Sequence, residues 1–287
     1  MYTDFAVHDR AYITIVRWPS AFTREDRVAA LVDALGIDPY IAAQKATHAP
    51  PLVLARVDAL VASDVVARFR ARRVSAFALT QAYLKAQPRP FLVKRLVPAL
   101  GAEDPMYMVE PWRGESAGLL TRDIFLIVRA AIERSRTVVE VERSSEFSNR
   151  DALALDMLEP AGQVRNSSHD TTHILDLYMN DGSRFRCNAD RLSFDVLGKQ
   201  RGMTDLENTD KLALRLATEA PQAQIDTNFR HFRIPADLVQ DLVSVFPNHT
   251  STQRDSTAAF DFYSLWTYAI HRGLAKAAPQ RSDLPDA

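Results

Sequence analysis

The chain of 287 residues has few of the residues that build disulfide frameworks and phosphate-binding loops. Its single cysteine, Cys187, cannot form an internal disulfide and excludes a zinc site made of several cysteines. Its nine glycines occur neither in G-x-G-x-x-G order nor in G-x-x-x-x-G-K-[ST] order, which argues against nucleotide-binding folds of those kinds. The cysteine content is typical of a reducing compartment, so we expect a cytoplasmic protein.

Long apolar runs and an excess of charge are also missing. No run approaches the ~18 apolar residues of a transmembrane helix, so no membrane span is expected. The start, "MYTDFAVHDRAYITIVRWPS", has acids where a signal peptide needs a basic start and an apolar centre. A formal net charge of −1 argues against a surface built as a whole for nucleic acid or anionic membrane. With 47% hydrophobic residues the chain can bury a sizeable core, and its length predicts two domains.

The N-terminal part alternates strands and helices. The β-branched and aromatic runs "AYITIVRW", "PPLVLARV" and "VSAFALT" predict three strands. Between them, Thr23 is a predicted N-cap of a first helix, Asp38 of a second, and Ser63 or Asp64 of a third. Residues 9–81 are therefore expected to form a β-α-α-β-α-β module that folds by itself.

This order resembles the C-terminal domain of the bacterial ribosomal stalk protein and the related adaptor of the Clp protease. The resemblance rests on "YITIVRW", "LGIDPYIAAQKATHAPPLVLARV" and "ASDVVARFRARRVSAFAL". It implies a small module that binds other proteins and performs no chemistry. The stalk domain's glycine- and lysine-rich turn is replaced by "GIDPYIAAQK", where only Lys45 lies near a family lysine, and the adaptor's Asn-Asp motif is replaced by "RWPSAF". The resemblance therefore implies the fold and not the partner of either family.

The rest of the chain is predicted to hold a second, larger domain, which makes the protein α+β. We expect a proline-spaced connector over 82–105, antiparallel strands followed by helices over 106–276, and a disordered tail over 277–287. "MYMVEPW", "RTVVEVER" and "LSFDVLG" predict strands, and "HILDLYM", "NDG" and "SRFRC" together predict a hairpin. "GLLTRDIFLIVRAAIER" suits a strand or a helix, and residues 142–165 suit a loop. The runs "NTDKLALRLATEAP", "IPADLVQDLVSVF" and "STAAFDFYSLWTYAIHRGL" predict helices, and the order of elements suggests a pleckstrin-homology-like domain by analogy alone.

Two histidines four residues apart, His169 and His173, are the clearest candidate for a metal site. On a helix such a pair can share a zinc ion, but Asp170 and two threonines lie between them and a strand follows. On a strand the pair would be ~13 Å apart, too far to share one ion. We therefore expect a turn before a hairpin here and no metal. Asp226, in "IDTNFRHF", could join a polar cluster, but a capped turn with Phe229 and Phe232 in the core is favoured.

One charge feature stands out: no acid occurs from Val65 to Ala102, whereas eight basic residues do. We call these eight residues the basic segment: Arg68, Arg70, Arg72, Arg73, Lys85, Arg89, Lys94 and Arg95. Such a group can bind an acidic protein, RNA or a lipid head group. It can equally pair with acids of the second domain or form a solvated helix face.

The first functional hypothesis is a non-enzymatic cytoplasmic adaptor or regulatory protein that binds another macromolecule through its N-terminal module and the basic segment. The expected partner is a protein with an acidic surface. The alternative is a metal-dependent or hydrolytic enzyme that uses His169, Asp170, His173 and Asp226. A second alternative is an RNA- or ribosome-binding protein. No cofactor is expected, and the sequence predicts neither the partner nor the oligomeric state.

Overall fold

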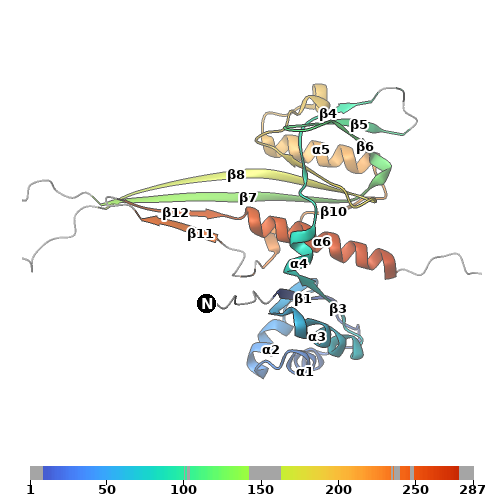
Figure 1. The fold of residues 1–287 in the computed structure, drawn as a ribbon, viewed down its shortest axis with the longest axis vertical. Helices are drawn as coiled ribbons and strands as arrows, with labels where there is room; N and C mark the ends of the chain where they lie inside the picture. The colour runs from blue at the N-terminus through green and yellow to red at the C-terminus, as the bar shows by residue number, and fades with distance from the viewer. Residues whose placement is uncertain are drawn as a thin grey trace, which may run out of the picture. The chain divides into compact units, whose positions relative to one another are not determined.

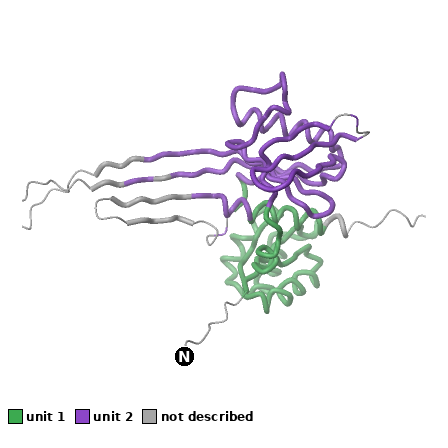
Figure 2. Tube along the Cα trace, turned by 45° about the horizontal axis from the view of Figure 1, so that its top comes forward, with its two compact units in different colours: residues 1–89, 231–233, 262–287 green, residues 90–230, 234–261 purple. Residues whose placement is uncertain are grey.

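The computed structural model describes residues 9–99, 101, 104–141, 163–233, 235, 240–245 and 249–277. The chain divides into two compact units (Figure 2). Unit 1 comprises Met1–Arg89, His231–Arg233 and Phe262–Ala287, and unit 2 comprises Pro90–Arg230 and Ile234–Asp261. Both units contain helices and sheets, which confirms the predicted α+β class.

Unit 1 has the predicted β-α-α-β-α-β order, followed by a short helix. Its strands form an antiparallel sheet in the order β2-β1-β3. Its elements are β1 (Arg10–Arg17), α1 (Arg24–Leu35), α2 (Pro39–Ala46), β2 (Leu52–Asp58), α3 (Ala59–Ala71), β3 (Ser75–Thr80), α4 (Gln81–Ala86) and most of α6 (Thr257–Ala277).

The helices of unit 1 begin at side chains that accept their first free N–H groups. Thr23 and Asp26 form a capping box at the start of α1, and the Asp38 carboxylate accepts a hydrogen bond from the Tyr40 N–H at 2.8 Å. The predicted start of α3 at Ser63 or Asp64 is wrong. Asp58, the last residue of β2, accepts the Leu60 N–H, so α3 begins directly after the strand.

Both faces of the unit 1 sheet are covered. Ile13 and Ile15 of β1 join a buried core with residues of α1 and α3. Thr14, which points to the opposite face, accepts a 2.9 Å hydrogen bond from the Trp266 indole of α6. The predicted module over 9–81 is therefore incomplete. The second face of its sheet is covered by α6, a helix from the far end of the chain.

Unit 2 is built on a sheet of nine strands (Figure 1). Its strand order is β11-β12-β7-β8-β9-β4-β5-β6, and β10 pairs with β7 outside this path. The strands are β4 (Phe91–Pro98), β5 (Met106–Pro111), β6 (Ala117–Leu120), β7 (Ile124–Val141), β8 (Gln163–Met179), β9 (Arg184–Asn188), β10 (Gln224–Asp226), β11 (Gln240–Val245) and β12 (His249–Asp255). The helical elements are η1 (Thr121–Asp123), η2 (Asp195–Gln200), α5 (Asp205–Glu219) and η3 (Asn228–His231), whose last residue counts with unit 1.

Several expectations for this region need correction. The connector expected over 82–105 holds α4 and also β4, which is part of the large sheet. "LSFDVLG" is no strand, because it makes one bridge at Ser193 and then forms η2. "IPADLVQDLVSVF" contains β11 where a helix was expected. Among the described strands the sheet runs from β11 to β6 without closing, unlike the pleckstrin-homology-like barrel suggested by analogy.

Other expectations are confirmed. The "NDG" hairpin joins β8 to β9, and the ambiguous run at 118–134 is β6, η1 and the first part of β7. The aromatic residues of α6 are buried, as expected of a helix that seals a core. The Asp226 carboxylate accepts the Asn228 N–H and Phe229 is buried, as expected of the capped turn, whereas Phe232 is only partly buried. The predicted tail, apart from Ala277 at the end of α6, and most of the predicted loop over 142–165 lie outside the described residues, although 163–165 belong to β8.

The core of unit 2 lies between the sheet and α5. Leu175, Leu177 and Phe185 from the β8–β9 hairpin pack with Leu212 and Leu216 of α5. Among the described residues, no helix has the length and hydropathy that crossing a membrane requires.

Candidate functional site

The basic segment is divided between the two units. Arg68 donates to the Asp33 carbonyl at 3.1 Å, and Arg72 forms a 3.0 Å ion pair with the Asp33 carboxylate. Arg70 donates to the Ala76 carbonyl at 3.2 Å. In unit 1, three of the basic side chains are therefore held by contacts close to α3, although Arg72 is still 43% exposed.

The remaining basic residues have other surroundings. Arg73 has a positive φ of 60° in the turn after α3. In unit 2, the Lys94 ammonium lies 5.6 Å from the centre of the Trp112 ring, and Arg95 forms a 3.3 Å ion pair with Asp195. The sequence grouped these residues because they are close in the chain, whereas the structure distributes them over several local contacts. Lys85 lies on α4 and Arg89 follows it, both in unit 1.

The residues of the enzyme alternative lie on two strands that flank β7. His169, Asp170 and His173 are all in β8, so the expected turn before the hairpin is wrong. His169 and Asp170 are exposed, whereas His173 is partly buried. Asp226 is in β10, which pairs with β7 at Leu126–Val128. Within the described parts of the chain, no three or more His, Cys, Asp or Glu side chains gather closely enough to hold a metal ion.

His173 differs from its neighbour along the strand in its environment. Burial lowers the pKa of its imidazole, and the positive charge of Arg129 lowers it further. Asp210 and Asp205 oppose this shift. The neutral imidazole is therefore the favoured form of this histidine in the folded protein.

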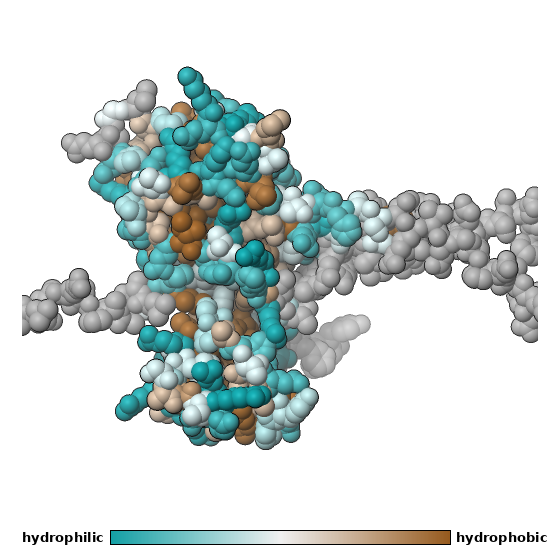
Figure 3. Space-filling model, turned by 180° about the vertical axis from the view of Figure 1, so that it is seen from behind, coloured by the Kyte–Doolittle hydropathy of each residue, from teal (hydrophilic) through white to brown (hydrophobic). Residues whose placement is uncertain are grey.

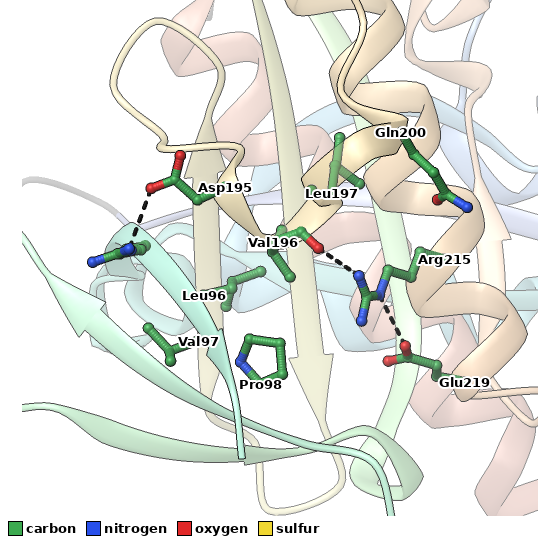
Figure 4. A pocket seen from close by; sticks show the side chains of 11 residues that line it. Leu96, Val97, Pro98, Asp195, Val196, Leu197, Gln200, Arg215 and Glu219 are labelled. Atoms are coloured by element: carbon green, nitrogen blue, oxygen red, sulfur yellow. Dashed lines mark hydrogen bonds and ion pairs between the residues drawn. The ribbon is translucent and has the colours of Figure 1, made fainter. Parts of the chain in front are cut away.

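A pocket of about 610 Å³ opens beside β4, η2 and the end of α5 (Figure 4). Arg95 faces Asp195 on one side, and on the other side Arg215 donates both to the Val196 carbonyl and to Glu219. Acids and bases of the lining thus pair with one another.

The Tyr107 hydroxyl extends this chain of polar contacts. It donates a 2.6 Å hydrogen bond to the Glu219 carboxylate, and Arg215 lies 5.7 Å from the centre of its ring. Burial and the contact with Glu219 raise the pKa of this phenol, so it stays protonated and donates. Such a chain fixes the end of α5 against β5.

A buried ionic cluster on the opposite face of the β8–β9 hairpin was not predicted. Asp176 is fully buried and accepts hydrogen bonds from the guanidinium groups of both Arg184 and Arg186. Arg186 also forms a 2.6 Å ion pair with Asp261 in the first part of α6. The sequence carried a signal for it, because the predicted hairpin places Asp176 directly opposite Arg186.

The sole cysteine is inert. Cys187 lies on β9 inside the core of unit 2. Burial raises the pKa of its thiol, which leaves the nucleophilic thiolate unpopulated.

The most unusual feature of unit 2 is the outer part of its longest strands. We call this part the arm (Figure 1). It consists of β11, β12, residues 133–141 of β7 and residues 163–171 of β8. Ile132 and Thr172 lie opposite each other and are both buried. Farther out, the described side chains of 167–171 are all exposed, and none of the described side chains of β7 past Ile132 is buried. Figure 3 shows mostly hydrophilic residues where the described part of the arm leaves the body of unit 2.

Two contacts between described side chains of the arm are polar. Arg134 forms a 3.4 Å ion pair with Asp255, and the hydroxyls of Thr137 and Ser167 are 3.5 Å apart. A ribbon is marginal by itself where its side chains are not buried, as in the described outer part of β7 and β8, because strand pairs gain most of their stability from burying one face.

β8 also has an open edge in the arm. β9 pairs with β8 over Ile174–Tyr178, and the last backbone hydrogen bond joins the Ala189 N–H to the His173 carbonyl at 2.9 Å. Among the described residues, nothing pairs with β8 on that side farther out. In an antiparallel strand, the N–H and C=O of one residue point to the same side, and the side alternates along the strand. The backbone groups that point to the open edge therefore belong to every second residue of β8 counted from His173. These are Thr171, His169, Ser167 and Arg165.

Comparison with known proteins gives no relative: no family model matches the chain, and no curated protein or solved structure matches it significantly.

Proposed function

We propose that the protein is a non-enzymatic interaction protein and that its arm is the element that binds another protein. The observation that carries the proposal is the open edge of β8 over Ser167–Thr171, where exposed side chains accompany backbone groups that point away from β7. Such an edge is a template for an added strand, which gains main-chain hydrogen bonds from it. A partner strand would also supply the neighbouring chain that the arm lacks in isolation.

Two other candidate centres for chemistry, the pocket beside β4 and Cys187, hold their reactive groups in contacts with neighbouring residues. Arg95 and Asp195 of the pocket pair with each other, as do Arg215 and Glu219. Cys187 is buried in the core. A catalytic acid, base or nucleophile has to reach a substrate, and these groups are already engaged by neighbouring residues.

The basic segment provides a second candidate surface. Arg72 and Arg68 both contact Asp33, but Arg72 keeps 43% of its side chain exposed and could also meet an acidic protein or RNA. A partner of this kind would be recognised by charge and would dissociate as salt is raised.

Site-specific photo-crosslinking in the cells that naturally make the protein tests the two surfaces together. A photoreactive amino acid is placed at Ser167 in the arm, at Arg72 in the basic segment, or at Leu214, which is 68% exposed on α5 and serves as the control. We expect a protein crosslink at Ser167 and none at Leu214. Crosslinks at Arg72 alone would replace the arm by the basic segment as the binding surface. Equal crosslinking at all three positions would overturn the proposal, because it would indicate random collisions.

A further inference from the structure

The turn between β8 and β9 contains a bond that aspartate chemistry makes reactive. Asp181 and Gly182 lie at the tip of this hairpin, and the sequence holds no second Asp–Gly pair and no Asn–Gly pair. Glycine has no side chain to shield its amide nitrogen, so this nitrogen attacks a preceding aspartate more readily than that of a bulkier residue does. Asp181 is also exposed, so water reaches its carboxylate.

We propose that Asp181–Gly182 is a site of spontaneous covalent modification, at which Asp181 isomerises to isoaspartate, and that Ser183 restrains the reaction in the folded protein. The Gly182 nitrogen loses its proton and bonds to the Asp181 Cγ, while Cγ loses one oxygen as water, which closes a succinimide ring. Water then adds to the main-chain carbonyl of the ring and breaks its bond to the Gly182 nitrogen. The chain afterwards continues through Cγ, and no atom is gained or lost overall.

The folded turn engages the attacking nitrogen. The Gly182 N–H donates a 3.0 Å hydrogen bond to the Met179 carbonyl, which closes a β-turn with Asn180 and Asp181 at its centre. The Met179 N–H also donates to the Ser183 carbonyl at 3.0 Å. Closing the succinimide requires the Gly182 N–H to leave its acceptor, so a hydrogen bond of the turn has to break first.

Ser183 holds the group that is attacked. The Asp181 Oδ1 atom accepts the Ser183 N–H at 2.8 Å and the Ser183 hydroxyl at 2.7 Å. These two hydrogen bonds lower the pKa of the Asp181 carboxyl, so it stays ionised. A carboxylate resists the reaction, because its charge repels a nucleophile and because an oxygen leaves as water only after it has been protonated.

The position of the turn gives the modification a structural consequence. Isoaspartate adds one carbon to the main chain between Tyr178 and Arg184, which are opposite each other in the hairpin. In the same ladder Asp176 is opposite Arg186, and their side chains form part of the buried ionic cluster. A lengthened turn cannot close the hairpin in this register with the same hydrogen bonds, because loop length and register are linked. The modified protein should therefore have a less stable unit 2.

Prolonged incubation of the purified chain at mildly acidic pH tests the site. Isoaspartate is located by peptide mapping and counted by methylation with an isoaspartyl methyltransferase. We expect it at residue 181 and not at Asp190, which is also exposed in a turn but is followed by Arg191. The chain unfolded in urea should react faster than the folded chain, and Asp181→Glu, whose side chain closes only a larger ring, should give no signal at this position.

Two substitutions test the role of Ser183. Ser183→Ala removes the hydroxyl and should speed isomerisation of the folded protein at least about tenfold, the factor that corresponds to one lost hydrogen bond to a charged group. Ser183→Thr keeps both donors and should behave like the wild type. In urea, where the turn is absent, all three proteins should react at similar rates. Hydrogen exchange of the β8–β9 peptides is the control for a variant that merely opens the hairpin.

Each part of the proposal has a result that overturns it. No isoaspartate at residue 181 of the unfolded chain, or equal amounts at Asp190, would overturn the site. Equal rates for the folded wild type and Ser183→Ala, or a rise no larger than the rise in hydrogen exchange, would overturn the role of Ser183. If the modified protein, separated by chromatography, unfolds at the same urea concentration as the unmodified protein, the predicted effect on the hairpin is wrong.

Discussion

The buried ionic cluster of unit 2 provides the sharpest test of the fold. Asp176 has no exposed side-chain surface, and the side chains of Arg184 and Arg186 are only 4% and 7% exposed. The Asp176 carboxylate accepts from Arg186 Nε at 2.7 Å and Nη2 at 2.9 Å, and from Arg184 Nε at 3.1 Å. Asp176→Asn keeps the shape of the side chain but removes its charge, and leaves two buried cations with the half-exposed Asp261 as the nearest acid.

The expected loss is large. Breaking a buried ion pair by removing one partner typically costs about 3–5 kcal/mol, because the other charge stays buried without compensation. For a unit of this size, 1 kcal/mol corresponds to about 2–4 °C, so the transition of unit 2 should fall by roughly 6–20 °C. Urea titration with hydrogen exchange of the β8–β9 peptides as the readout assigns the change to unit 2.

Two control variants separate burial of charge from other effects. Asp261→Asn changes an acid that is 46% exposed and should cost no more than about 1 kcal/mol. Simultaneous replacement of Asp176, Arg184 and Arg186 by apolar residues of similar volume should restore most of the stability, because it removes the desolvation cost together with the attraction. If Asp176→Asn is tolerated within about 1 kcal/mol, the cluster does not hold the hairpin as described.

Three further predictions concern other contacts. The lowered pKa of His173 means that the unfolded chain binds a proton more readily, so this residue contributes stability above its ordinary pKa of 6.5 that is lost as the pH falls through that value and its folded pKa; His173→Gln should flatten the decline in unfolding free energy between about pH 7.5 and 5. Trp266→Phe should cost unit 1 about 1–3 kcal/mol by leaving the buried Thr14 hydroxyl unpaired, and Thr14→Val in the same chain should recover much of it, so additive losses in this double-mutant cycle would contradict a direct contact. Tyr107→Phe should lower the unfolding free energy of unit 2 by about 1.5–3 kcal/mol through loss of the hydrogen bond to Glu219, and a smaller effect in the Glu219→Gln background would show that the two residues act together.

The N-terminal elements could be predicted from the sequence because their ends are encoded locally. Thr23 and Asp38 accept hydrogen bonds from the helices that they precede, and a Gly36 with a positive φ of 63° ends α1. The role of α6 could not be predicted. Its aromatic residues indicated a buried helix, but no local pattern relates Trp266 to Thr14, which lies 252 residues away.

The first part of β7 was ambiguous because it is buried on both faces. Leu126, Ile127 and Val128 are consecutive and have no exposed surface, so the apolar and polar alternation of an ordinary strand is absent. β11 was mistaken for a helix for a related reason, because the apolar residues of "IPADLVQDLVSVF" satisfy a helical period as well. Periodicity reports which face is buried, and it fails where both faces or neither face is covered.

The candidate site, the open edge of β8, lies where neither face of the strand is covered by described residues. Ser167, Ser168, His169 and Asp170 are all exposed, so no buried face of the strand selects one register of β8 over its neighbours. The register of the arm must then be imposed from its base, where Ile132 and Thr172 enter the core, and the influence of that row weakens with distance along the ribbon. A partner strand at the open edge would supply what the arm lacks, since in-phase hydrogen bonds to it stabilise one register and disfavour a shift by a single residue. The polar sequence that hides the outer part of β8 from pattern analysis is thus also what makes its pairing depend on the strand beside it.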